Sequence, residues 1–278
     1  MSNRVVIEAG KNGGNYWKDL KSYKGLFYFL AWRDVLVRYK QTTIGIAWSV
    51  LRPLLQIVVM VGFGVIFNSD HGTIPRPLLV AAAVLPWGLF ATAFSESAGS
   101  LVGNSNLLTK VYFPRIIVPA STLIVSLIDF AIALALMIIL LLIYGYSPTT
   151  NLFYFPLFLL LTLFTAAGAG FLVSALNVKF RDFRYIVPFV VQLGFFISPI
   201  AYDSTRVYAS EKIPEFVKTL YAMNPMVGVI DGFRWCMLGG DLQIHWSAFL
   251  TSIGVSVVIF ILGVWYFRRV ESTFADIV

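Results

Sequence analysis

The chain has 278 residues, of which 58% are hydrophobic and only 13% are charged, and its mean hydropathy is +0.80. Because soluble domains carry about a quarter of their residues as charged side chains, this composition excludes an ordinary water-soluble protein and predicts one whose solvent is the lipid bilayer. The net charge of +7 would suggest a nucleic-acid partner in a soluble protein, but in a membrane protein it is first a topology signal.

We expect residues 1–43 to form a cytoplasmic leader that is not cleaved. Charged residues recur throughout this segment, and it has no apolar run as long as the core of a signal peptide. Within it, residues 17–39 (WKDLKSYKGLFYFLAWRDVLVRY) mix aromatic and aliphatic residues with charges at helical spacing. This pattern is typical of a helix that lies along the membrane interface. The pattern suits a simple surface anchor as well as a helix with a functional role.

Residues 44–278 predict one transmembrane domain with six membrane-spanning helices. A helix needs about 20 mostly apolar residues to cross roughly 30 Å of hydrocarbon. Six stretches meet this requirement, at 44–67, 77–97, 116–143, 152–176, 185–201 and 246–267. The fifth is short and contains Pro188 and Pro199, so its ends are the least well defined.

The distribution of Lys and Arg predicts that both termini are cytoplasmic. Of the 21 such residues, fifteen lie in the leader and in the second, fourth and final connections, five lie in the other connections, and Arg52 lies within the first span. Positively charged loops remain on the cytoplasmic side of a membrane, so the net positive charge of the chain is explained without a nucleic-acid partner. The expected location is the bacterial inner membrane, surrounded by membrane lipid.

The longest outer connection, at 202–245, contains two segments with apolar residues at helical spacing. They cover 213–222 and 225–238, and Asn224–Pro225 separates them. We expect two short amphipathic helices that re-enter the outer leaflet, because this would bury their apolar faces.

The sequence contains no motif for hydrolysis. G-x-x-x-x-G-K-[ST], G-x-S-x-G and H-E-x-x-H are all missing, and the single cysteine, Cys236, cannot form an internal disulfide. No Cys/His cluster has the spacing of a metal site. We therefore do not expect an enzyme, or a cofactor or metal held by this chain, and any energy that the protein uses would come from an ion gradient or from another subunit.

Three charged residues within the spans each need a reason, because a charge at a helix centre costs about 2.5–3.5 kcal/mol on the insertion scale. Glu96 suits a side chain that reaches the interface, and Asp129 suits either a hydrogen-bonded structural role or a titrating one. Arg52, just before Pro53, suits either an interfacial position or contact with an anionic headgroup that enters from the inner leaflet.

Aromatic residues are abundant, with 24 Phe, 13 Tyr and 7 Trp. Most suit the two belts at the membrane interfaces. A second interpretation is a path for sugars, because pyranose rings stack on aromatic planes. The candidates for such a path are Trp87, Phe195, Phe196 and Tyr202.

Four segments resemble the permease subunit of ABC-2 type polysaccharide exporters, which move O-antigen, teichoic acid and capsule chains. They are LAWRDVLVRYKQTTIGIAWSVLRPLLQ at 30–56, NSNLLTKVYFPRIIVPAS at 104–121, LNVKFRDFRYIVPFVVQLGFFISPIAY at 176–202 and NPMVGVIDGFRWCML at 224–238. The resemblance implies an all-α polytopic fold with an interface helix, two re-entrant gate helices and six spans, assembled as a homodimer.

The resemblance also implies partners and site residues. Two copies of a separate ATPase would hold ATP and Mg, and the substrate would be a lipid-pyrophosphate-linked polysaccharide. Segment 101–113 would be the coupling segment, with Asn104, Leu107, Leu108, Lys110, Tyr112 and Phe113. The interface helix would place Arg33, Asp34, Arg38 and Tyr39 near the ATPase or the inner gate. The outer gate would contain Phe216, Tyr221, Phe233 and Arg234.

Three alternatives remain at this point. The cargo could be teichoic acid or capsule rather than O-antigen, or it could be a drug or a lipid carried by the same superfamily. A protein of another class, a gradient-driven carrier, would use Asp129 and Glu96 as titrating sites.

Overall fold

The computed structural model describes residues 16–40, 46–66, 74–110, 113–147, 149–239, 242 and 244–274. Throughout these ranges the regular structure is helical. In chain order the elements are α1 (Tyr16–Ser22), α2 (Lys24–Lys40), α3 (Ile46–Ile66), α4 (Arg76–Gly103), α5 (Ser105–Lys110), α6 (Ile117–Ile143), the 3-10 helix η1 (Thr150–Tyr154), α7 (Phe155–Lys179), α8 (Phe183–Ile197), α9 (Ser204–Ala209), α10 (Glu215–Ala222), α11 (Pro225–Leu238), α12 (Trp246–Val270) and the 3-10 helix η2 (Glu271–Thr273).

Five of the six predicted spans are confirmed as helices long and apolar enough to cross a membrane. These are α3, α4, α6, the continuous η1–α7 segment, and α12 with η2. The predicted fifth span is α8, which has 15 residues and is therefore about 22 Å long. It ends before Ser198, whose extended backbone is the conformation favoured before a proline. As a full crossing, α8 remains a prediction.

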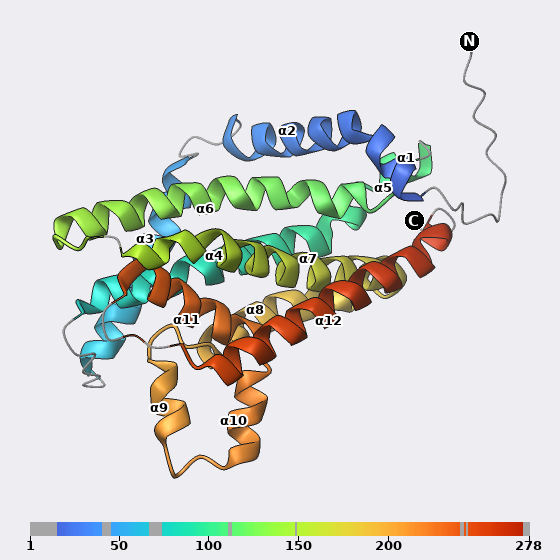
Figure 1. The fold of residues 1–278 in the computed structure, drawn as a ribbon. Coiled ribbons are helices and arrows are strands. Elements are labelled where there is room, and N and C mark those ends of the chain that lie inside the picture. The colour runs from blue at the N-terminus through green and yellow to red at the C-terminus, as the bar shows by residue number, and fades with distance from the viewer. Residues whose placement is uncertain are drawn as a thin grey trace.

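Helix α4 lies at the centre of the bundle, between α6 and α7, and most of its side chains are buried (Figure 1). Helices α7 and α12 pack closely through glycine. A Cβ atom at Gly263 would lie 2.1 Å from the carbonyl oxygen of Gly168, so the two backbones touch. Nearby, Thr165 Oγ1 donates to Ser256 Oγ at 2.8 Å. Small residues and hydroxyl bonds are the usual contacts between helices in lipid.

The predicted interface helix at 17–39 is two helices, α1 and α2. Leu30 and Ala31 are the buried residues of α2, and α2 lies along α6 (Figure 1). Helix α1 is anchored at the C-terminal end of the chain, where Tyr16 donates to the Glu271 carboxylate at 3.0 Å and Arg268 lies over the Tyr16 ring. As a result, α1, α5 and the C-terminal end gather at one end of the bundle (Figure 1).

The segment that follows α8 forms α9, α10 and α11. Helix α11 has the predicted limits, because Asn224 caps its first turn by accepting from the Met226 amide and Pro225 is the first helical residue. Helix α10 begins two residues later than the predicted segment at 213–222. Helix α9 was not predicted. Together α9 and α10 extend away from the bundle (Figure 1).

The predicted coupling segment at 101–113 is not one element. Helix α4 continues to Gly103, six residues beyond the predicted end of the second span, and Asn104 separates it from α5. The Asn104 amide nitrogen, Nδ2, donates to the Ser100 carbonyl at 2.9 Å and so closes the last turn of α4. Asn104 is thus the joint between a central helix and a short terminal one.

Candidate functional site

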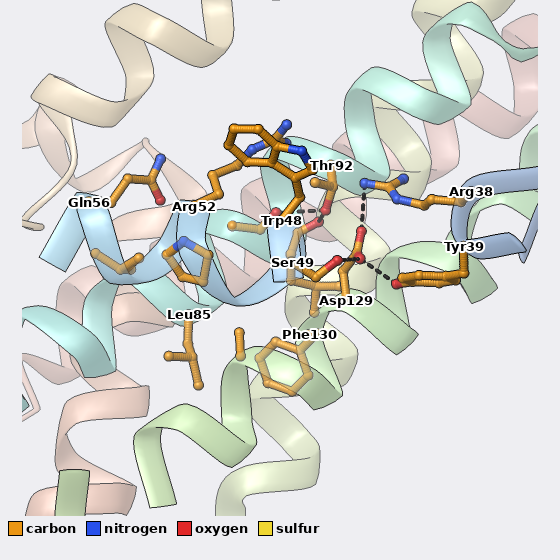
Figure 2. Close-up of a pocket in the computed structure, with 15 residues that line it drawn as sticks. Arg38, Tyr39, Trp48, Ser49, Arg52, Gln56, Leu85, Thr92, Asp129 and Phe130 are labelled. Carbon is orange, nitrogen blue, oxygen red and sulfur yellow. Dashed lines mark hydrogen bonds and ion pairs between the residues drawn. The ribbon is translucent and has the colours of Figure 1, made fainter. Parts of the chain in front are cut away.

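A cavity of about 380 Å³ lies among α2, α3, α4 and α6 (Figure 2). Its lining combines polar residues from four helices with apolar ones. The polar residues are Arg38, Tyr39, Ser49, Arg52, Gln56, Thr92 and Asp129. The apolar residues include Trp48, Pro53, Val84, Leu85, Leu89, Phe130 and Ala133.

A second cavity, of about 570 Å³, adjoins the first and reaches α8. The two share Arg38, Arg52, Gln56, Gly88 and Thr92, so they form one recess. We call the two cavities together the recess, and the second cavity its extension. The extension is also lined by Leu55, Val59, Met60, Trp87, Ala91, Ser95, Glu96, Val191, Gln192, Phe195 and Phe196. The lining of the recess offers both charged and apolar groups, which suits an amphipathic ligand.

Asp129, from the middle of α6, binds three side chains of α2 and α3. Tyr39 OH and Ser49 Oγ donate to Oδ1 at 2.5 and 2.8 Å. Arg38 Nη2 lies 2.6 Å from Oδ2 and forms an ion pair with it. Figure 2 shows these side chains converging on Asp129.

Arg38 also binds a second carboxylate, since its Nη1 donates to Glu96 Oε1 on α4 at 3.1 Å. We call Arg38, Glu96 and Asp129 the Arg38 clasp. It joins α2 to α4 and α6. Burial, reinforced by the hydrogen bond to Asp129, raises the pKa of Tyr39 to about 12, so its phenol remains protonated and acts as a donor.

Arg52 makes no hydrogen bond or ion pair with any side chain in the described ranges, and it lines both parts of the recess. Within α3, Pro53 cannot donate to the Ser49 carbonyl, which leaves that oxygen without its helical donor. A guanidinium with five donors and no acceptor among the described residues is suited to an anion.

Three of the four predicted substrate-path aromatics lie together on the extension of the recess. The Trp87 and Phe195 ring centroids are 6.2 Å apart, and those of Phe195 and Phe196 are 5.6 Å apart. Gly194 makes room for this group, because a Cβ atom there would lie 2.5 Å from Cη2 of Trp87. Tyr202 does not line the recess; its hydroxyl donates to the Ile197 carbonyl.

The predicted coupling residues divide between two places. Arg33 Nη2 donates to Asn104 Oδ1 at 2.8 Å, and Arg33 also pairs with Asp34 at 2.6 Å. Phe113 is buried in the cluster that includes Leu30 and Phe267, and Leu107 packs against that cluster. Arg38 and Tyr39, by contrast, lie in the recess. Leu108 and Lys110 belong to α5, but their side chains, like the whole of Tyr112, lie outside the described residues.

The predicted gate residues differ in exposure. Phe216 on α10 is exposed, whereas Tyr221 and Phe233 are buried. Phe233 lies among Phe130, Phe155 and Phe158. Arg234 is 5% exposed and binds three backbone carbonyls. Phe233 and Arg234 therefore connect α11 to the bundle core.

Sequence reasoning identified Arg52 but missed other polar residues of the recess. Ser49 and Gln56 lie three residues before and four residues after Arg52, on one face of α3, and this spacing could have identified them as parts of a polar stripe on an apolar helix. Thr92 and Gln192 carry no comparable signal. Within the described ranges, no three His, Cys, Asp or Glu side chains come close enough to hold a metal ion.

The long apolar helices and the charged recess among them define an α-helical, multi-pass membrane protein. Residues 25–238 match the model of the family described as ABC-2 type transporter, so the chain belongs to that family. The resemblance of the four sequence segments is thereby confirmed.

Relatives with assigned names cover most of the chain. It is 31% identical over 220 residues to the O-antigen export system permease protein RfbA of Myxococcus xanthus, which covers 78% of this chain and 82% of the relative. It is 27% identical over 247 residues to a protein of the same name from Klebsiella pneumoniae, covering 88% and 92%. It is 23% identical over 242 residues to the polysialic acid transport protein KpsM of Escherichia coli, covering 86% and 92%.

Proposed function

We propose that the chain is the membrane subunit of an ATP-driven exporter of lipid-linked polysaccharide, with an O-antigen chain as the cargo. The relatives named for O-antigen export are more similar in sequence than those named for polysialic acid or capsule export, which supports this choice of cargo. A capsule chain is the next alternative. Teichoic acid as the cargo keeps only the support of the family resemblance.

The energy for transport comes from a partner in this proposal. The sequence has no phosphate-binding loop of its own. Two copies of a separate ATPase would bind ATP and Mg, and a homodimer of this chain would form the path between two protomers. The basic connections would face the cytoplasm. There α5 would contact the ATPase, since α5, α1 and the C-terminal end share one end of the bundle (Figure 1).

The substrate would enter sideways between α3 and α8. Both helices line the extension of the recess. The pyrophosphate would bind Arg52, the sugars would stack on Trp87, Phe195 and Phe196, and the lipid tail would remain near the bilayer. Helices α10 and α11 would close the exit until a chain passes.

The observation that supports this proposal best is that Arg52 has no carboxylate or carbonyl partner among the described residues. An arginine inside a membrane domain normally finds a carboxylate or a carbonyl. Arg52 has neither among the described residues, while the other arginine of the recess, Arg38, has two carboxylates. The recess therefore has one cation available to a ligand.

The gradient-driven carrier alternative requires a carboxylate that can exchange protons freely. Asp129 and Glu96 both form ion pairs with the Arg38 guanidinium. This pairing favours a structural role for them and supports the exporter instead.

The test uses the complex with the ATPase in membranes. Arg52→Gln keeps a polar side chain but shortens it and removes its charge. It should abolish most of the ATP turnover that lipid-linked glycan stimulates and most of the glycan displayed on the cell surface. Arg206→Gln on α9, outside the recess, is the control and should retain both activities. Unaltered stimulation in Arg52→Gln would refute the headgroup role.

A further inference from the structure

Helix α2 touches both the recess and the joint that precedes α5. Arg33 donates to Asn104 at 2.8 Å, and five residues later Arg38 reaches the recess. On a helix, five residues correspond to about 7.5 Å along the axis. One rigid element of 17 residues therefore contacts the substrate site and the start of the predicted coupling segment.

Two features of the Arg38 clasp allow Arg38 to break its ion pairs with Glu96 and Asp129. The Glu96 side chain is 50% exposed and the Asp129 side chain 13% exposed, so one of the two ion pairs lies at the open surface of the recess. When Arg38 leaves and the end of α2 moves with it, Tyr39 leaves as well, and Asp129 keeps the hydrogen bond from Ser49 of α3 on Oδ1. Arg38 can therefore exchange partners without leaving a bare carboxylate behind.

An anion in the recess would compete for Arg38. Phosphate oxygens bind guanidinium groups through paired hydrogen bonds, as carboxylate oxygens do. Arg38 and Arg52 both line the two parts of the recess. A diphosphate has two phosphate groups, so it can engage both cations at once, whereas an uncharged lipid engages neither.

We propose that Arg38 is the substrate sensor of this permease: a lipid diphosphate that binds Arg52 draws Arg38 away from Glu96 and Asp129 and so releases the C-terminal end of α2. This inference rests on the proposed function, because it needs an anionic headgroup in the recess. The two states are defined by the partner of Arg38, which is the carboxylates when the recess is empty and the phosphate when it is filled.

The Asn104 side chain supplies the path from α2 to α5. Its Nδ2 donates to the Ser100 carbonyl, and its Oδ1 accepts from Arg33, so both ends of the amide are used. A movement of α2 therefore acts directly on the joint between α4 and α5. Binding of a ligand in the recess would therefore move α5, at the end of the bundle where the ATPase would bind. In this way ATP would be hydrolysed only when cargo is bound.

The experiment measures the distance between spin labels on α2 and α6 in the full-length protein in nanodiscs. Labels are placed at the exposed positions Val37 and Ala131; the native Cys236 is fully buried and need not be replaced. A polyprenyl diphosphate is added, with the corresponding polyprenol as the uncharged control. In the wild type the diphosphate should produce a second, longer distance population, and the polyprenol should not.

Two kinds of variant separate the clasp from the binding site. Arg38→Gln should show the longer distance without ligand and bind the diphosphate about tenfold to hundredfold more weakly, because a charge-assisted contact is lost. The double variant Glu96→Gln/Asp129→Asn should also show the longer distance without ligand but still bind the diphosphate, because Arg38 is retained. Lys24→Gln at the start of α2 is the matched control and should behave as the wild type does.

The outcomes are distinct. If the wild type binds the diphosphate but Arg38→Gln and the double variant keep the wild-type distances and response, Arg38 is not a sensor and the proposed function stands. If the wild type does not bind the diphosphate at all, the proposed function fails and the sensor fails with it.

Discussion

Arg234 Nε donates a hydrogen bond to the backbone carbonyl of Leu79 at 3.1 Å and so joins α11 to the buried first half of α4. The other two nitrogens of the same guanidinium donate to the carbonyls of Tyr202 and Ile200, in the turn after α8. One buried side chain therefore satisfies three backbone acceptors on two other segments. These acceptors would otherwise be costly, because little water can reach them.

The first prediction follows from this geometry. Arg234→Lys keeps the positive charge but has a single ammonium group, which cannot reach three carbonyls in different directions. At least one buried carbonyl is left without a donor, at about 1–3 kcal/mol each. Thermal unfolding of the purified protein in detergent should occur at a clearly lower temperature. Arg206→Lys, on α9, is the control and should unfold as the wild type does. If Arg234→Lys is as stable as the wild type, the three hydrogen bonds of the Arg234 guanidinium are not important for stability.

The contact between Gly168 and Gly263 gives a second prediction. A methyl group added at Gly263 would overlap the Gly168 carbonyl oxygen, so α7 and α12 would have to separate. Gly263→Ala should therefore destabilise the protein by about 1–3 kcal/mol. Gly254→Ala on the same helix is the matched control, since a Cβ there meets nothing within 4 Å. The measurement is the temperature at which each variant loses its folded peak on gel filtration, and equal temperatures would contradict the prediction.

Local patterns were sufficient for most of the helices. The first residue of α11 followed from Asn224 and Pro225, because a cap and a first-turn proline act within a few residues. The break between α4 and α5 was missed, since Asn104 has no strong helix-ending signal by itself and is held by Arg33, which is 71 residues away in sequence.

Four residues of the recess were candidates for the substrate path from the sequence, and that role stays a prediction. Arg52, Trp87, Phe195 and Phe196 were expected near the substrate and do line one recess. The pairing of Arg38 with Asp129 was not foreseen. It joins residues about 90 positions apart on two helices, and the sequence of either helix is compatible with many other partners. Arg234 was expected at a gate, but its three carbonyl acceptors depend on tertiary packing that no local pattern encodes.

A third prediction concerns pH and Asp231 on α11. Burial raises the pKa of Asp231 from its ordinary value of 3.8 to about 6, and Arg234 and Ser204 oppose this rise only in part. Between these two pH values the folded protein keeps a proton that the unfolded chain releases. The contribution of Asp231 to stability therefore increases as the pH falls through 6 toward 4, and is lost as the pH rises above 6.

The measurement compares the unfolding temperatures of the wild type and Asp231→Asn at pH 7.5, 6.0 and 4.5. Asp203, His245 and Arg234 line the same cavity and are present in both proteins, so the difference between them isolates Asp231. The wild type should gain stability relative to Asp231→Asn as the pH falls. A constant difference over this range would mean that the carboxyl group has an ordinary pKa.

A fourth prediction concerns Leu107, on α5, and the predicted docking of the ATPase. Leu107 packs against the cluster that contains Leu101 and Phe113, so it orients the short helix. Leu107→Asp would place a carboxylate at this apolar contact, which is unfavourable by several kcal/mol unless the helix turns away. We expect the variant to insert in the membrane but to bind the ATPase weakly and to display little glycan. Asn106→Asp is the matched control, because it introduces the same charge at the exposed neighbouring position. It should retain binding and export. If Leu107→Asp folds, binds the ATPase and exports glycan at the wild-type level, then α5 does not couple the two subunits.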